Sequence, residues 1–188
     1  MSNSVGAEVD IALASGDNIP RERVHEWITA ASDLSTLSKL YRLTNEGYYR
    51  IQPELGQDET CSLILTYLLG CVRDNIEDSD EIQSRFEAAQ SLHVWFCHLN
   101  ETGGTSAILT KAAHGIKELF LTSDDETRDA IETMFLEHAL EMSALRPYFQ
   151  DWSDHPVLQA AWKRATEWGI AHPGYTWAML KQLQAQSE

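Results

Sequence analysis

Apolar residues recur at spacings of three and four along most of this chain, which is the periodicity of one face of an α-helix. Two of the longest stripes are Ile82, Phe86, Ala89, His93, Phe96 and Leu99, and then Ile131, Phe135, His138, Met142, Leu145 and Phe149. No segment shows the alternation of apolar and polar residues, rich in β-branched side chains, that a strand needs. The sequence therefore predicts an all-α protein, a compact multi-helix bundle of about eight helices.

The domain organisation follows from where these stripes begin. Residues 1–18 are small and polar, with three acids and no base, and they predict a loose N-terminal arm. Residues 19–188 carry the stripes, and a chain of this length can bury a substantial core, so we expect a single helical domain there. Helix pairs could start near 58, 105 and 154, but their residues do not match position by position, which favours a bundle over a solenoid.

The sequence also bears on the cellular compartment. The first ten residues lack the basic and apolar regions of a signal peptide. The most apolar run, residues 61–72, predicts a helix buried nearly all round, and it is shorter than the roughly 20 apolar residues that span a bilayer. The three cysteines (Cys61, Cys71, Cys97) form no CxxC pair, and an odd number suits a reducing compartment. We therefore expect a cytoplasmic protein without disulfides.

The charge balance is strongly acidic and unevenly distributed. Lys and Arg number 14 against 29 Asp and Glu, a formal net charge of −15. Two tight clusters stand out: Asp74, Glu77, Asp78, Asp80 and Glu81, and then Asp124, Asp125, Glu126, Asp129 and Glu132. Each cluster has the spacing of a helix-capping box, Asp78 with Glu81 and Ser123 with Glu126, and acids are stabilised by the dipole at a helix start.

These clusters admit two interpretations. The first is that they are solvated helix starts with no further role. The second is that the helix ends lie together and form one acidic surface, which would repel nucleic acid and membranes and attract a basic protein. Neither cluster has the D-x-D-x-D-G pattern of a calcium loop.

The candidate catalytic and metal-binding residues are incomplete. Glu22-x-x-His25 resembles one element of a carboxylate di-iron bundle, but the second copy that such a bundle needs is missing. Cys97 and His98 are adjacent on a helix, so their side chains point about 100° apart and do not face each other. His93 and His138 fall in apolar stripes, where a hydrogen-bonded structural role is the simplest interpretation. We expect no metal, no cofactor and no enzymatic activity.

The sequence thus favours a binding protein that docks on a basic protein partner, such as a toxin, and neutralises it. We expect it to bind neither nucleic acid nor membrane. We expect the acids of both clusters to contact this partner, with Trp152 or Trp95 as apolar anchors. In size, charge and helicity the chain is similar in general character to bacterial immunity proteins and antitoxins, although no motif carries the likeness. The alternatives are a small helical ligand-binding protein or enzyme that uses His, Glu and aromatic pocket residues, and an accessory subunit of a larger assembly.

Overall fold

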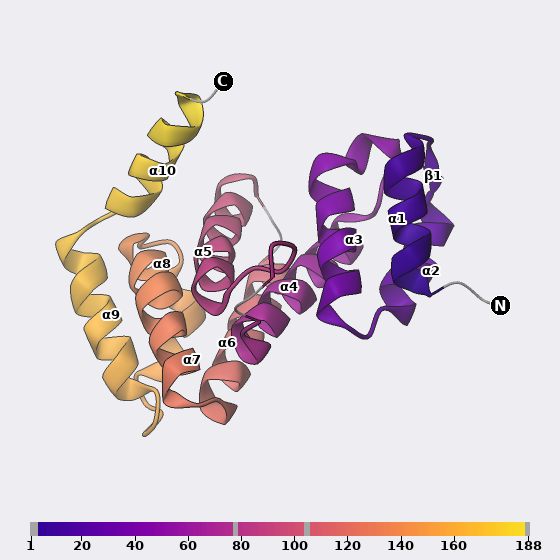
Figure 1. The fold of residues 1–188 in the computed structure, drawn as a ribbon. Coiled ribbons are helices and arrows are strands. Elements are labelled where there is room, and N and C mark those ends of the chain that lie inside the picture. The colour runs from indigo at the N-terminus through magenta and orange to yellow at the C-terminus, as the bar shows by residue number, and fades with distance from the viewer. Residues whose placement is uncertain (1–3, 77–78, 104–105, 187–188) are drawn as a thin grey trace.

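The computed structural model describes residues 4–76, 79–103 and 106–186, and it confirms the all-α prediction (Figure 1). The chain is 76% helical, and its ten α-helices in the described residues slightly exceed the expected eight. The α-helices are α1 Val5–Ser15, α2 Arg21–Ala30, α3 Leu34–Glu46, α4 Gln57–Asp74, α5 Arg85–Glu101, α6 Ser106–Thr122, α7 Asp125–Ala130, α8 Glu137–Glu141, α9 Gln159–Ala171 and α10 Tyr175–Ala185. The shorter elements are β1 Ile19–Pro20, the 3-10 helix η1 Tyr48–Arg50, β2 Ile51–Gln52, the π-helical turn η2 Ile131–Leu136 and the 3-10 helix η3 Arg146–Trp152.

The expected loose arm is instead largely helical, so that prediction was wrong for most of residues 1–18. Ser4 caps α1 by accepting a hydrogen bond from the backbone of Ala7, and Val9 is completely buried where α1 packs against α3. The buried guanidinium of Arg50 donates to backbone carbonyls at the end of α1 and just beyond it. These contacts lie far apart in sequence, which is why local composition alone suggested a loose segment.

Helix α4 is the central element of the molecule. It packs against α3 on one side and against α5 and α6 on the other, and Figure 1 shows it between the group α1–α3 and the group α5–α10. Residues all around the helix are buried, as its apolar run predicts; they include Leu63, Tyr67, Leu68 and Val72. The parallel pair β1–β2, with Ile19 opposite Ile51, joins the segment between α1 and α2 to the segment that follows α3 and η1.

The second stripe of the sequence does not form one continuous helix. It is divided among the π-helical turn, α8, the turn that follows α8, and η3, which begins just before Pro147. The divided segment still delivers its aromatic residues to one core, where Phe96, Phe135, Phe149 and Trp152 are buried and their rings pack mostly edge to face. The chain turns at Met142, whose backbone is extended, and η3 then brings Phe149 and Trp152 back to the same core.

Both predicted capping boxes are misplaced. Helix α5 begins at Arg85, with Ser84 and Glu87 forming its capping box, so Glu81 lies in the preceding loop, and Asp78 falls outside the described residues. Helix α7 is capped by Asp124, which accepts from the Thr127 backbone at 2.8 Å, rather than by Ser123. In the described part of the chain, no helix combines the length and apolar character needed to cross a membrane.

Candidate binding groove

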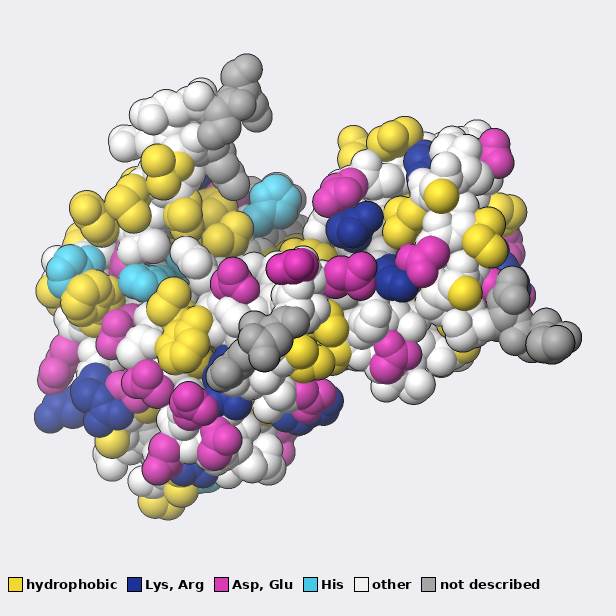
Figure 2. All heavy atoms as spheres, in the orientation of Figure 1, with side chains coloured by type: hydrophobic (Ala, Val, Ile, Leu, Met, Phe, Trp, Pro, Cys, Tyr) yellow, Lys and Arg dark blue, Asp and Glu magenta, His cyan; other side chains and the backbone are white. Residues whose placement is uncertain are grey.

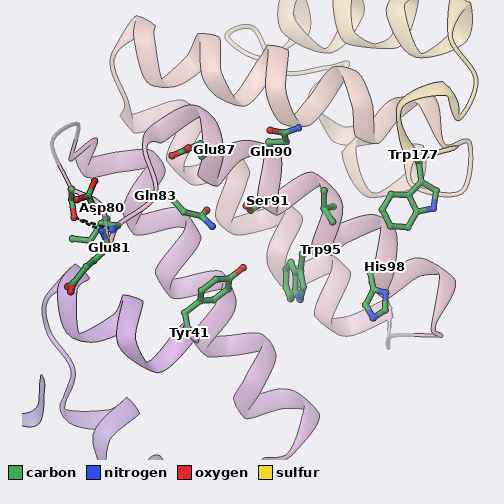
Figure 3. Close-up of a pocket in the computed structure, with 13 residues that line it drawn as sticks. Tyr41, Asp80, Glu81, Gln83, Glu87, Gln90, Ser91, Trp95, His98 and Trp177 are labelled. Carbon is green, nitrogen blue, oxygen red and sulfur yellow. Dashed lines mark hydrogen bonds between the residues drawn. The ribbon is translucent and has the colours of Figure 1, made fainter. Parts of the chain in front are cut away.

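A groove of about 870 Å³ separates the N-terminal helices from the rest of the molecule (Figure 3). Tyr41 of α3 lines one side, the loop of residues 79–83 closes one end, and Trp177 of α10 lies at the other end. The remaining wall is the outward face of α5, from Glu87 to His98, whose lining residues recur at helical spacing. The groove is therefore built from three parts of the chain that are distant in sequence: α3, the loop with the following α5, and α10.

The loop of residues 79–83 is held in place by hydrogen bonds to the neighbouring helices. The hydroxyl of Ser38 in α3 donates to the backbone carbonyl of Glu81, and the backbone N–H of Gln83 donates to the Tyr67 hydroxyl of α4 at 3.2 Å. Within the loop, the Ser79 hydroxyl accepts from the backbone N–H groups of Glu81 and Ile82. The loop is thus anchored to both α3 and α4, and its acidic side chains have a defined place at the groove.

Aromatic side chains form the apolar part of the groove. Tyr41 packs against the buried ring of Tyr67, with ring centroids 4.7 Å apart, and Trp95 of α5 packs edge to face on Phe96. Figure 3 shows Tyr41 and Trp95 pointing from α3 and α5 into the space between the two helices. Trp95 is partly buried by the core and partly open, as expected for an anchor residue at a contact surface.

The charged part of the groove is purely acidic. Asp80, Glu81 and Glu87 line it, and no Lys or Arg is among the lining residues. None of the three carboxylates forms an ion pair anywhere in the described residues. Hydrogen bonds from Ser84 lower the pKa of Glu87, which keeps this carboxylate ionised. The groove therefore offers carboxylates without ion pairs beside aromatic rings, with Lys39 as a cation within electrostatic reach of Glu81.

The second acidic cluster is different, because arginines already bind most of it. Asp124 and Glu126 both contact the buried Arg85, at 3.8 and 2.7 Å. The helix starts of α5 and α7 do lie together, as the acidic-surface interpretation required, but a cation sits between them. The remaining pairs are Asp125 with Arg128, Glu132 with Arg164, and, in the first cluster, Asp74 with Arg73.

The other candidate contact residues divide three ways. Asp129 is exposed and makes no ion pair within the described residues. Glu77, like Asp78, lies outside the described residues. Trp152 has 0% exposure, so the prediction that it anchors a partner was wrong: it packs on Phe149 and Phe120 in the core. Trp152 lies at the end of the 3-10 helix η3, which places its side chain in the core.

A second polar cluster lies where α8 meets α10. Nδ1 of His138 is 2.9 Å from Oε1 of the buried Glu141, and Glu141 also accepts from the backbone and hydroxyl of Thr176 at 2.7 Å. Burial by itself raises the pKa of Glu141, but these hydrogen bonds together lower it below its ordinary value. Sequence reasoning did not identify Thr176, because nothing local links it to a helix 35 residues earlier.

This cluster does not have the arrangement of a nucleophilic triad. In such a triad the hydroxyl and the carboxylate bind opposite ring nitrogens of the histidine. Here the Thr176 hydroxyl lies 3.1 Å from the same Nδ1 of His138 that faces Glu141. The described residues also contain no group of three or more His, Cys, Asp or Glu side chains that could hold a metal ion.

His93 is buried next to this cluster, with its ring centroid 5.5 Å from that of His138. Its side chain is 0% exposed, and neither ring nitrogen has a hydrogen-bond partner in the described structure. The expected burial is therefore present, but the expected hydrogen bond is not. Burial, with a smaller effect of His138, lowers the pKa of His93 from 6.5 to about 4, so the ring is neutral near pH 7.

Comparison with known proteins gives no relative for this chain. No protein-family model matches it, and neither a curated protein nor a solved structure does. The groove and its charges are therefore the features from which a function can be inferred.

Proposed function

We propose that this protein binds a basic protein partner in the groove and thereby neutralises it, as a binding protein of the cytoplasm rather than an enzyme. The observation that supports this most is the set of three carboxylates, Asp80, Glu81 and Glu87, around an aromatic groove without any Lys or Arg in its lining. A lysine or arginine side chain entering the groove would meet three carboxylates that form no ion pair within the described residues.

Two physical effects would act together on such a partner. The net charge of −15 raises the rate of encounter with a basic surface, and it disfavours nucleic acid and anionic membranes. Inside the groove, an arginine can stack on the faces of Tyr41 or Trp95 while its guanidinium meets a carboxylate. Affinity would then depend on the aromatic anchors, and the association rate on the charges.

Neutralisation would follow from covering the partner's cationic side chains. A partner that uses these side chains to bind the phosphates of nucleic acid loses that contact when they are held in the groove. This mode of action is similar in general character to that of immunity proteins and antitoxins.

The proposal is tested by reversing charges at two matched places. Asp80→Lys with Glu81→Lys changes the groove, and Asp125→Lys with Asp129→Lys changes the net charge by the same amount at the start of α7. Binding of an oligo-arginine peptide and of proteins captured from the source cell is followed by surface plasmon resonance. We expect the groove variant to lower the association rate by about tenfold or more, and the α7 variant to lower it much less.

Salt and Trp95 provide two further measurements. Raising the ionic strength should slow association of the wild type, because exposed charges are screened beyond about 8 Å at physiological salt. Trp95→Ala should instead raise the dissociation rate, with a loss of about 2 kcal/mol in affinity if Trp95 is the central anchor. Equal losses in both charge-reversed variants would mean that net charge alone attracts the peptide, and the groove would then not be the binding site.

The alternative of a small-molecule ligand has one observation in its favour. The groove volume of about 870 Å³ lies in the range of ligand pockets, which hold drug-sized molecules. Two results together would replace the proposal by the ligand-binding alternative. The first is that the Trp95→Ala variant captures the same proteins as the wild type. The second is that small cations from a metabolite extract raise the melting temperature of the wild type but not of this variant.

A further inference from the structure

Helix α10 has an inner face that is fixed to the body of the protein. Thr176 is bonded to Glu141, and both the Trp177 indole and the Lys181 ammonium are bonded to Glu101, at 2.7 and 2.8 Å. These contacts come from positions 176, 177 and 181, which lie on one side of the helix. They determine which side of α10 faces outward.

The outward face of α10 carries no charge. Its exposed positions are Tyr175, Ala178, Met179, Gln182, Leu183, Ala185 and Gln186. Lys181 is also exposed, but its ammonium is bound to Glu101 at the edge of the inner face. Tyr175, Met179 and Leu183 recur every four residues and are 62%, 43% and 54% exposed, so they form an apolar stripe along the helix. Figure 2 shows hydrophobic side chains over the start of α10 and its junction with α9, among white, uncharged ones. A helix face directed to solvent normally carries charged residues, so this face has the character of an interface.

The distribution of charge indicates what covers this face. Two copies of a chain with a net charge of −15 repel each other over most of their surface. Residues 154–188 are the exception, because they contain three acids and three bases, whereas residues 51–103 contain ten acids and two bases. A basic partner would gain little on an uncharged face, but a second copy meets the least repulsion there.

We propose that the outward face of α10 pairs with α10 of a second copy of this chain, antiparallel and about a two-fold axis near Met179. Such an isologous contact places the same patch on both sides, so Tyr175 of each copy lies near Leu183 of the other. Antiparallel pairing also sets the two helix dipoles in opposite directions. The helix of 11 residues is about 16 Å long, so the contact is small and the dimer is weak.

This inference does not depend on the proposed function, and salt distinguishes the two. Binding of a basic partner weakens as salt rises, because the attraction is screened. The dimer should strengthen, because screening reduces the repulsion between two acidic copies. The same series of salt concentrations therefore gives opposite trends for the two contacts.

The test is sedimentation equilibrium on the full chain across the micromolar range. We expect the apparent mass to rise from 21.2 kDa toward twice that value, and to rise further at higher salt. Tyr175→Glu should weaken the dimer by about tenfold or more, since it places a carboxylate in each half of an apolar contact. Tyr49→Glu is the matched control, because Tyr49 is also 62% exposed but lies in η1, in the N-terminal group. A monomer at every concentration, or equal weakening by both substitutions, overturns the proposal.

Crosslinking tests the antiparallel geometry. Under mild oxidation, Met179→Cys should form a disulfide-linked dimer, because residue 179 lies next to its own copy at the two-fold axis. Tyr49→Cys should not form one, and the three native cysteines are buried and do not compete. A dimer that Met179→Cys does not crosslink, or one that Tyr49→Cys crosslinks equally, contradicts pairing through α10.

Discussion

Replacing Gly169 by alanine should destabilise the protein, although the same change favours an isolated helix. Gly169 lies in α9 where this helix passes α8. A Cβ atom there would be 2.4 Å from the carbonyl oxygen of Leu140, 2.5 Å from its carbonyl carbon and 2.7 Å from the backbone nitrogen of Glu141. All three are backbone atoms, so no side-chain rotation can relieve the contact, and α8 and α9 must move apart by roughly 1 Å.

The magnitude follows from two opposing contributions. Alanine in a helix interior is favoured over glycine by about 1 kcal/mol. Overpacking costs about 1–3 kcal/mol, and a backbone contact belongs at the upper end of that range. Separating the helices also strains Arg146, which donates to the carbonyls of both Leu140 and Gly169. The free energy of unfolding should therefore fall by about 2 kcal/mol, which lowers the melting temperature by roughly 4–8 °C for a chain of this size.

The assay is urea and thermal unfolding followed by circular dichroism, with Gly115→Ala as the matched control. A Cβ at Gly115 in α6 would meet only the Cδ1 atom of Leu69, at 3.0 Å, which is the end of a flexible side chain. Gly115→Ala should therefore be neutral or stabilising by up to about 1 kcal/mol. If Gly169→Ala unfolds at the same urea concentration as Gly115→Ala, or a higher one, the close approach of α8 and α9 is incorrect.

Two more predictions concern buried titratable groups. Because the pKa of His93 is near 6.5 when unfolded and about 4 when folded, the unfolded state binds the proton first, and the free energy of unfolding should fall as the pH drops from about 6.5 to about 4. His93→Phe should remove this loss of stability, which is on the order of 3 kcal/mol, and urea unfolding measured across that pH range checks it. If the variant loses stability with falling pH as the wild type does, the prediction is wrong. Burial raises the pKa of Cys71 to about 11 and of Cys97 to about 12, so neither thiol should react with iodoacetamide near pH 7 in the folded protein. Replacing both of these, and Cys61, by alanine should keep the fold with or without reductant, and rapid labelling of the wild type would refute the buried positions.

The parts of the fold that the sequence could predict are those governed by local rules. Asp33 caps α3 by accepting a hydrogen bond from the backbone of Thr36, and capping of this kind depends on a few adjacent residues. The apolar run of residues 61–72 does form the buried helix α4. The start of α5 was misplaced because Ser84–Glu87 and Asp78–Glu81 have the same spacing, and only the anchoring of the loop to α3 and α4 decides between them.

The candidate site was predictable only in part, for a related reason. Composition identified the acidic loop and Trp95 as contact candidates, and the groove brings them together. It could not identify Tyr41, which comes from α3 and reaches the groove through tertiary packing. Nor could it show that Trp152 is buried, since an aromatic residue after a proline occurs both in surface loops and in cores.

The acidic residues of this molecule fall into those that already bind a cation of the chain and those that do not. For the binding of a partner, this difference matters more than the number of acidic residues. Those at the start of α7 cap a helix or bind Arg85, Arg128 and Arg164, so their charge is largely used within the chain. Exposed ion pairs of this kind contribute little to stability, but they do reduce the field that a partner meets. Asp80 and Glu81 form no ion pair in the described chain, although Lys39 lies within electrostatic reach of Glu81, and their loop is fixed beside an aromatic groove. An acidic surface is therefore best located by the carboxylates that remain after internal pairing, and Asp80 and Glu81 are those that remain beside the aromatic groove.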